Sequence, residues 1–209
     1  MSSVDTYFEQ GMAYFEAAEY EKAIEMFTKS LRLSLGDLAE MLLYRGIAYA
    51  YLEAYDKALA DFNGALQRNA YFADAYNERG SLRRIQGDID GAIQDLSMAI
   101  QIDPKHYAAY YNRGLAYEQK RDYARAVADL DATLAINPTI ATAYEARGRV
   151  RAALHEFGGA IQDLERYLRM GGGREFDNHS EIQSLILSLR VNRLLSRVIP
   201  ARFLPTPHA

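Results

Sequence analysis

The amino-acid sequence predicts an all-α protein, a right-handed superhelical solenoid of five helical hairpins with a C-terminal capping helix. Three observations predict this fold. A glycine recurs every 34 or 35 residues, apolar positions recur in phase with it, and each period contains two stretches with helical spacing. The recurring glycines are Gly11, Gly46, Gly80, Gly114 and Gly148.

Two further positions repeat in every period, an alanine twelve residues after the glycine and a large apolar residue sixteen after it. The alanines are Ala23, Ala58, Ala92, Ala126 and Ala160, and the apolar residues are Phe27, Phe62, Leu96, Leu130 and Leu164. Small residues let two helix backbones approach closely while larger side chains fill the gaps beside them. We therefore expect each glycine to mark the close contact inside one hairpin.

The third period shows why each unit should be a hairpin. Tyr76, Gly80 and Arg83 share one helical stripe, and Ala92 and Leu96 share a second. Gly87-Asp88 lies between the two stripes and is a break signal at the end of the first helix. A single hairpin of this kind cannot bury both its faces, so neighbouring units must stack into a superhelix with a concave and a convex side.

This pattern resembles the tetratricopeptide repeat (TPR) family, in a bacterial-type variant with an Arg-Gly pair. A tyrosine stands four residues before the glycine at Tyr7, Tyr76, Tyr110 and Tyr144, and two units end in the turn prolines Pro104 and Pro138. The resemblance covers residues 1–174 in units at about 4–38, 39–72, 73–106, 107–140 and 141–174. Arg83 and Arg151 replace a tyrosine of the family pattern, and we expect them to weaken their units.

A periodic pair of opposite charges accompanies the glycine. Arginines stand directly before it at Arg45, Arg79, Arg113 and Arg147, and aspartates follow sixteen residues later at Asp61, Asp95, Asp129 and Asp163. In the first unit both charges are missing, since the two positions hold Gln10 and Met26. We interpret the pattern as a repeated ion pair between the two helices of a hairpin; the alternative is a row of arginines that grips an anionic ligand.

The sequence after the fifth unit predicts a capping helix over residues 175–199 and a flexible tail over 200–209. Gly171-Gly172-Gly173 should end the fifth hairpin, and Ser180 to Gln183 reads as a capping box. An early apolar stripe, expected to cap the fifth unit, consists of Ile182, Leu185, Ile186 and Leu189. Later positions separate an apolar face of Leu187, Val191, Leu194, Leu195 and Val198 from a basic face of Arg190, Arg193 and Arg197.

Three alternatives remain open for this basic, amphipathic end. The first is a plain cap with solvated arginines. The second is self-association through residues 187–199, which would occupy the groove of their own or a second chain. The third is contact with a membrane surface. After Glu181 the chain carries four arginines and no acidic residue, whereas the net charge of the whole chain is −4.

Composition excludes several classes of function. The 209 residues contain no cysteine, so disulfides and thiolate metal sites are excluded, and a cytoplasmic location without a secretory signal is expected. The mildly acidic balance argues against general nucleic-acid binding. His106, His155, His179 and His208 are scattered without metal-ligand spacing. We therefore predict no enzyme activity, no catalytic residues, no metal and no cofactor.

The family resemblance implies that the first helix of each hairpin lines a concave, partner-binding groove. The expected groove residues are Asp5, Phe8, Glu9, Met12, Glu40, Leu43, Tyr44, Ile47, Tyr51, Asp74, Asn77, Glu78, Tyr111, Asn112 and Arg149. Family members that hold a peptide carboxylate use a lysine and arginine clamp, and here Phe8, Met12, Leu43, Ile47 and Ala146 stand at those positions. The alternative for Ile47 and Leu115 is burial under neighbouring helices.

These residues predict a non-catalytic protein–protein interaction scaffold or adaptor. The carboxylates among them favour a basic or amphipathic peptide or helix as the partner. The alternative, a role of some similar short proteins, is an assembly factor or chaperone for a membrane or photosynthetic complex that uses the basic C-terminal helix.

Overall fold

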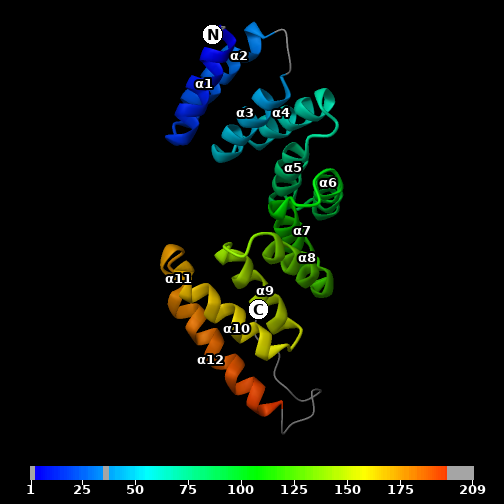
Figure 1. The fold of residues 1–209 in the computed structure, drawn as a ribbon, viewed down its shortest axis with the longest axis vertical. Coiled ribbons are helices and arrows are strands. Elements are labelled where there is room, and N and C mark those ends of the chain that lie inside the picture. The colour runs from blue at the N-terminus through cyan, green and yellow to red at the C-terminus, as the bar shows by residue number, and fades with distance from the viewer. Residues whose placement is uncertain (1–2, 35–37, 197–209) are drawn as a thin grey trace. The chain divides into compact units, whose positions relative to one another are not determined.

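The computed structural model describes residues 3–34 and 38–196, and all regular structure in these ranges is helical (Figure 1). The helices are α1 (Ser3–Glu16), α2 (Tyr20–Leu33), α3 (Ala39–Tyr51), α4 (Tyr55–Arg68), α5 (Ala73–Ile85), α6 (Ile89–Ile102), α7 (Tyr107–Gln119), α8 (Tyr123–Ile136), α9 (Ala141–Ala153), α10 (Phe157–Arg169), α11 (Gly172–Glu175) and α12 (His179–Leu195). The prediction of an all-α repeat fold is confirmed.

The chain divides into two compact units, residues 1–109 and 110–209, and the division falls within α7. In the first unit α1 packs on α2, α3 on α4 and α5 on α6, and in the second α9 packs on α10. The turn inside each hairpin contains one residue with positive φ, at Ala18, Glu53, Gly87, Arg121 and His155. Only the third hairpin places glycine, which has no steric cost in this conformation, at that position.

The recurring glycines are the points of closest helix contact, as expected from the sequence. A Cβ atom added to Gly46 would lie 2.6 Å from Cε1 of Phe62, and one added to Gly80 would lie 2.8 Å from Cγ of Leu96. Phe62 and Leu96 are fully buried. Any side chain at the glycine would therefore displace the large residue that fills the centre of the hairpin.

The glycine run after α10 behaves differently from the prediction. Gly171 has a φ of 87° and follows the end of α10, but Gly172 and Gly173 then begin the short helix α11. Both are buried, and a side chain at Gly172 would overlap the ring of Tyr167. The run therefore ends one helix and also lets the next one pack closely against it.

The predicted start of the last helix is also corrected. Ser180 lies inside α12 and is not its N-cap, because the helix begins at His179 after Asn178. The side chain of Asn178 accepts a hydrogen bond from the Tyr167 hydroxyl at 2.9 Å, so a tertiary contact occupies it. The last described residue is Ser196; Arg197, Val198 and the predicted tail 200–209 lie outside the described residues.

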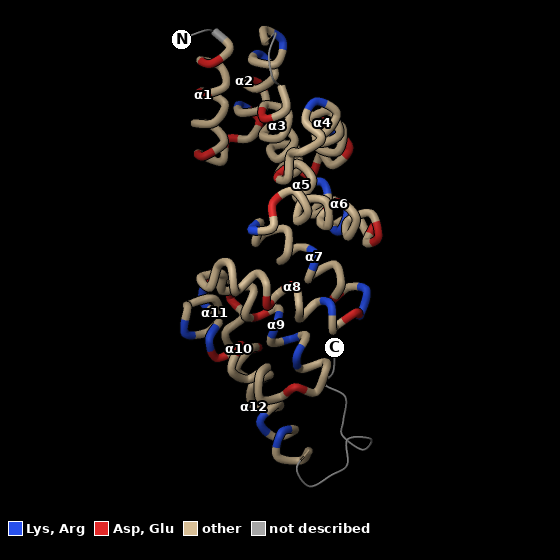
Figure 2. Tube along the Cα trace, turned by 45° about the vertical axis from the view of Figure 1, so that its right-hand side comes forward, with Lys and Arg blue, Asp and Glu red and all other residues tan. Residues whose placement is uncertain are grey.

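The inner face of α12 is buried against α10. Ile182, Ile186 and Leu189 share one core with Leu164 and Tyr167. Its outer face is apolar as well: the exposed fractions of Leu187, Val191 and Leu194 are 63%, 48% and 62%. Basic positions gather in the second half of the helix (Figure 2). The helix thus covers the fifth hairpin on one side and presents an apolar stripe on the other, while Arg190 and Arg193 lie toward α10.

The predicted ion pairs are present in every hairpin that carries both charges. Each guanidinium donates through Nε and Nη2 to the two oxygens of its aspartate, at 2.6 to 2.8 Å, in the pairs Arg45–Asp61, Arg79–Asp95, Arg113–Asp129 and Arg147–Asp163. All four aspartates are buried. This confirms the structural interpretation, since bidentate pairs already occupy the arginines.

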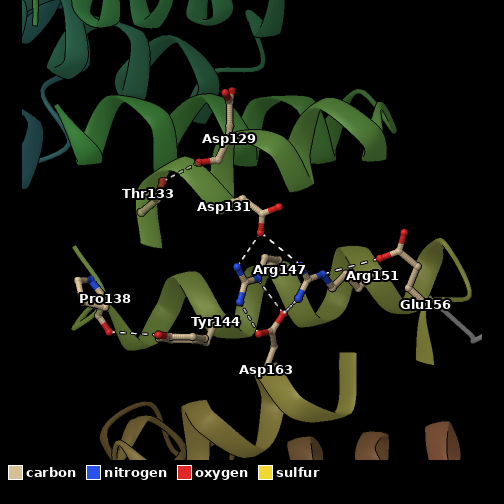
Figure 3. A network of polar contacts seen from close by, with 9 residues as sticks. All are labelled: Asp129, Asp131, Thr133, Pro138, Tyr144, Arg147, Arg151, Glu156 and Asp163. Carbon is tan, nitrogen blue, oxygen red and sulfur yellow. Dashed lines mark hydrogen bonds and ion pairs between the residues drawn. The ribbon is translucent and has the colours of Figure 1, made fainter. Parts of the chain in front are cut away.

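The same arginines also reach the preceding hairpin. Arg79 Nη1 donates to Asn63 Oδ1 at 2.6 Å, and Arg147 Nη1 donates to Asp131 Oδ1 at 2.6 Å (Figure 3). Arg45 Nη1 makes the corresponding contact with Thr28 Oγ1 at 3.1 Å. Each of these arginines therefore joins its own hairpin internally and links it to its neighbour.

Arg83 and Arg151, the two departures from the family pattern, join this network. Arg83 Nη1 lies 2.8 Å from Asp95 Oδ2, and Arg151 Nη1 lies 2.7 Å from Asp163 Oδ2. Figure 3 shows Arg147 and Arg151 converging on the Asp163 carboxylate. From the sequence we expect these arginines to weaken their units, whereas in the structure each adds a further bond to the buried aspartate of its hairpin.

Candidate functional site

Aromatic side chains from α1, α2 and α3 form a continuous cluster in the first unit. The ring centroids of Phe8 and Tyr44 lie 6.0 Å apart, and Phe15 lies 6.1 Å from Tyr44 and 6.0 Å from Tyr51. Tyr20 stacks on Tyr51 with a centroid distance of 4.5 Å. The structure therefore brings the predicted groove residues Phe8, Tyr44 and Tyr51 together and adds Tyr20, which lies on a second helix and has no counterpart in the groove pattern.

A cavity of about 330 Å³, here called the apolar cavity, opens between α3 and α5. It is lined by Ile47, Ala50, Tyr51, Tyr55, Phe62, Glu78, Ser81, Leu82 and Ile85. Tyr51 and Ile85 are exposed, with exposed fractions of 61% and 57%. Ile47 is only partly buried, so the alternative that neighbouring helices cover it completely does not hold.

A second cavity of about 270 Å³, here called the acidic cavity, lies nearer the N-terminal ends of the same two helices. Its lining consists of Ala39, Glu40, Leu43, Tyr44, Asn69, Phe72 and Asp74. Glu40 comes from the first turn of α3 and Asp74 from the first turn of α5, where a helix dipole favours negative charge. We call the two cavities together the α3–α5 groove.

Hydrogen bonds set the charge of the groove. His106 Nε2 lies 3.1 Å from Asp74 Oδ1, while His106 Nδ1 accepts the backbone N–H of Ala109. This contact lowers the pKa of the Asp74 carboxyl and raises the pKa of His106. Burial raises the pKa of the Glu78 carboxyl above its ordinary value, although a hydrogen bond from Asn77 opposes the shift.

Two expected groove residues are almost completely buried. Leu43 is 4% exposed and belongs to the core between α3, α4 and α5, and Asn77 is also 4% exposed. Asn77 acts on the groove indirectly, because its Nδ2 donates to Glu78 Oε1 at 2.9 Å. Asp5 and Glu9 are exposed on α1, and Met12 on the same helix is half-buried.

The remaining expected residues lie in the second unit and are half-buried there. Tyr111 and Asn112 belong to α7, and Arg149 belongs to α9. Arg149 donates to Glu145 at 2.8 Å and to Glu181 of α12 at 2.8 Å. Its guanidinium therefore links α9 to α12, a contact that the repeat pattern does not predict.

Within the described part of the chain, no group of three or more histidine, aspartate or glutamate side chains is arranged to hold a metal ion. Over the same residues, no helix combines the length and the apolar character that crossing a membrane requires.

Models of the tetratricopeptide repeat match three stretches of the chain. A TPR repeat model matches residues 80–121, and Tetratricopeptide repeat models match residues 107–140 and 8–71. Together these stretches cover more than half of the sequence. The chain belongs to the tetratricopeptide repeat family.

Relatives of this tetratricopeptide repeat chain include two curated proteins. It is 36% identical over 90 residues to Heat shock protein STI1 of Saccharomyces cerevisiae, a match that covers 42% of this chain and 15% of that protein. It is 32% identical over 83 residues to RNA polymerase II-associated protein 3 of Xenopus tropicalis, covering 40% of this chain and 12% of that protein. The matches thus span a small part of either relative.

Solved structures show the same fold. The structure of pilF from Pseudomonas aeruginosa is similar with a TM-score of 0.76 and 20% identity, over 95% of this chain and 93% of that chain. At this identity the similarity shows the fold alone. Repeat folds of this kind create extended surfaces that bind other proteins, so the tetratricopeptide repeats support a role as a protein-interaction scaffold.

Proposed function

We propose that this protein is a non-catalytic scaffold whose α3–α5 groove binds a basic or amphipathic segment of a partner protein. One observation carries the proposal. The apolar and acidic cavities lie along the same pair of helices, their linings include Glu40, Asp74 and Glu78, and no lysine or arginine lines either of them.

The two cavities suit different parts of one ligand. The apolar cavity offers Ile47, Tyr51 and Ile85 to aliphatic side chains, and burial of such side chains supplies most of the affinity of a groove for a helix. The acidic cavity offers Glu40 and Asp74 to cations, and exposed carboxylates of this kind add selectivity and a faster association rate.

A pair of designed peptides tests the proposal. Both have about 15 residues and the same helical leucine pattern, with lysine at the polar positions of one and glutamate at those of the other. Fluorescence anisotropy should show binding of the lysine peptide, weakened by salt, and no binding of the glutamate peptide.

Matched variants locate the binding surface. Glu40→Gln with Asp74→Asn removes both charges of the acidic cavity and should weaken binding of the lysine peptide roughly tenfold, since each exposed carboxylate contributes below about 1 kcal/mol. Gln67→Lys with Gln101→Lys changes the net charge equally on the exposed surfaces of α4 and α6 and should leave the affinity within about twofold. Equal losses in both variants would refute this location for the site.

We further propose that a second copy of the chain is one partner, with the outer face of its α12 docked on the groove. Leu187, Val191 and Leu194 form an exposed apolar stripe, and Arg190 on the same helix complements the carboxylates of the groove. Arg190 also contacts Glu165 of its own chain at 2.7 Å, but its side chain remains 58% exposed.

Light scattering tests this second proposal. The wild-type chain should show a mass above 23.6 kDa that rises with concentration. Leu187→Ser with Leu194→Ser should restore the monomer mass without loss of fold, because both side chains are exposed. Phe176→Ser removes an equally exposed apolar side chain outside the stripe and should have no effect. A wild-type chain that stays monomeric at every concentration would contradict the proposal.

A further inference from the structure

One carboxylate lies among apolar side chains in the groove. Glu78 forms part of the apolar cavity together with Ile47, Tyr51 and Ile85. Asn77 donates a hydrogen bond to it and the charge of His106 acts on it from a distance, but His106 pairs directly with Asp74. A carboxylate in an apolar wall without a cation in direct contact lowers stability, so its presence needs a separate reason.

We propose that the apolar cavity receives one lysine or arginine side chain of the bound segment, with the cationic head at Glu78 and the aliphatic stem along Ile47, Tyr51 and Ile85. This inference rests on the proposed function of the α3–α5 groove and specifies its ligand. Long basic side chains bury their stems on apolar surface while the head meets a charge. The exposed ring of Tyr51 offers a face on which a cation is attracted as well.

The size and charge of the cavity agree with this occupant. A volume of about 330 Å³ is at the lower end of the range for ligand pockets, which suits a single side chain better than a larger group. The carboxylate of Asp74, one turn earlier on α5, is already paired with His106. Glu78 is the carboxylate that lines the apolar cavity, and an incoming side chain provides its cation.

The groups around Glu78 define a pH test. Burial and the negative charge of Asp74 raise the pKa of Glu78. The hydrogen bond from Asn77 and the charge of His106 lower it. The phenols of Tyr51 and Tyr55 line the same cavity. Because the carboxyl of Glu78 is protonated at higher pH than an ordinary glutamate, affinity for a cation should fall as the pH drops through this raised pKa. Glu78→Gln should remove that component of the pH profile.

The lysine peptide described above is the probe, and Glu78→Gln is the test variant. At neutral pH the variant should bind at least about tenfold more weakly, since it loses a partly desolvated charge pair. It should also resist urea better than the wild type, because a raised folded-state pKa means that the ionised group opposes folding above its unfolded pKa. Glu21→Gln removes the same charge from the exposed first turn of α2, away from the groove, and should change affinity less than about twofold.

A peptide series identifies the side chain involved. Lysines of the probe are replaced singly by norleucine, which keeps the stem and removes the charge. One replacement should weaken binding to the wild type and have no effect on binding to Glu78→Gln, as expected for two groups in direct contact.

The outcomes separate this inference from the function on which it rests. If Glu78→Gln binds the probe as tightly as the wild type while neutralising Glu40 and Asp74 weakens binding, the single-cation inference is refuted and the groove proposal stands. If the wild type binds no lysine peptide, both are refuted.

Discussion

Replacing Arg113 by alanine should lower the free energy of unfolding by about 3 to 5 kcal/mol, because it strands a buried charge. Arg113 Nε and Nη2 donate to Asp129 at 2.7 and 2.8 Å, and the Asp129 side chain is only 9% exposed. The guanidinium also packs on the rings of Tyr110 and Tyr117, with centroid distances of 5.7 and 6.0 Å. In the described structure no other cation pairs with Asp129, so water would have to reach the carboxylate or the carboxylate would have to protonate.

Urea unfolding followed by circular dichroism measures the loss in free energy of unfolding. Because a repeat chain can unfold in steps, the free energies of all transitions are summed. Arg125→Ala is the matched control, because Arg125 pairs with Asp122 in the same hairpin but is 64% exposed, and its unfolding curve should stay close to that of the wild type. Replacing Arg113 by methionine and Asp129 by leucine together should recover most of the loss. An Arg113→Ala curve that coincides with that of the wild type would refute the reasoning.

Two further predictions concern packing. Gly46→Ala should destabilise the protein by about 1 to 3 kcal/mol, because the added methyl group meets the Phe62 ring. Gly158→Ala is the control: its Cβ has no neighbour closer than 3.7 Å, so it should be neutral or stabilising by up to about 1 kcal/mol. Thermal unfolding compares the two variants. Ile182→Ala should lower the free energy of unfolding by about 2 to 5 kcal/mol, because Ile182 is completely buried against α10. Amide hydrogen exchange should rise first in α12. Unchanged exchange there would show that other contacts hold α12.

The repeating contacts could be predicted from the sequence because fixed spacing within one hairpin determines them. A glycine and a large apolar residue sixteen positions later meet wherever two helices of this length are joined by the same turn, as Gly46 and Phe62 do. The arginine and aspartate pairs follow the same spacing, and their joint loss at Gln10 and Met26 already indicated a contact.

Features that depend on residues outside the repeat could not be predicted. The period assigns Leu43 and Asn77 to the groove face, but whether that face is covered depends on the packing of each neighbouring helix. The contact between His106 and Asp74 has no periodic signal, because histidine occurs at this position in one unit only. Helix α11 is equally irregular, since glycine disfavours helices and close packing of Gly172 against Tyr167 and of Gly173 against Leu168 favours it here.

The central claim is that the α3–α5 groove binds a basic segment through its carboxylates. The most direct test compares the affinity for the lysine peptide between two variants of equal net charge. The account predicts roughly tenfold weaker binding for Glu40→Gln with Asp74→Asn and no more than about a twofold change for Gln67→Lys with Gln101→Lys. Equal affinity in the wild type and the groove variant would contradict it.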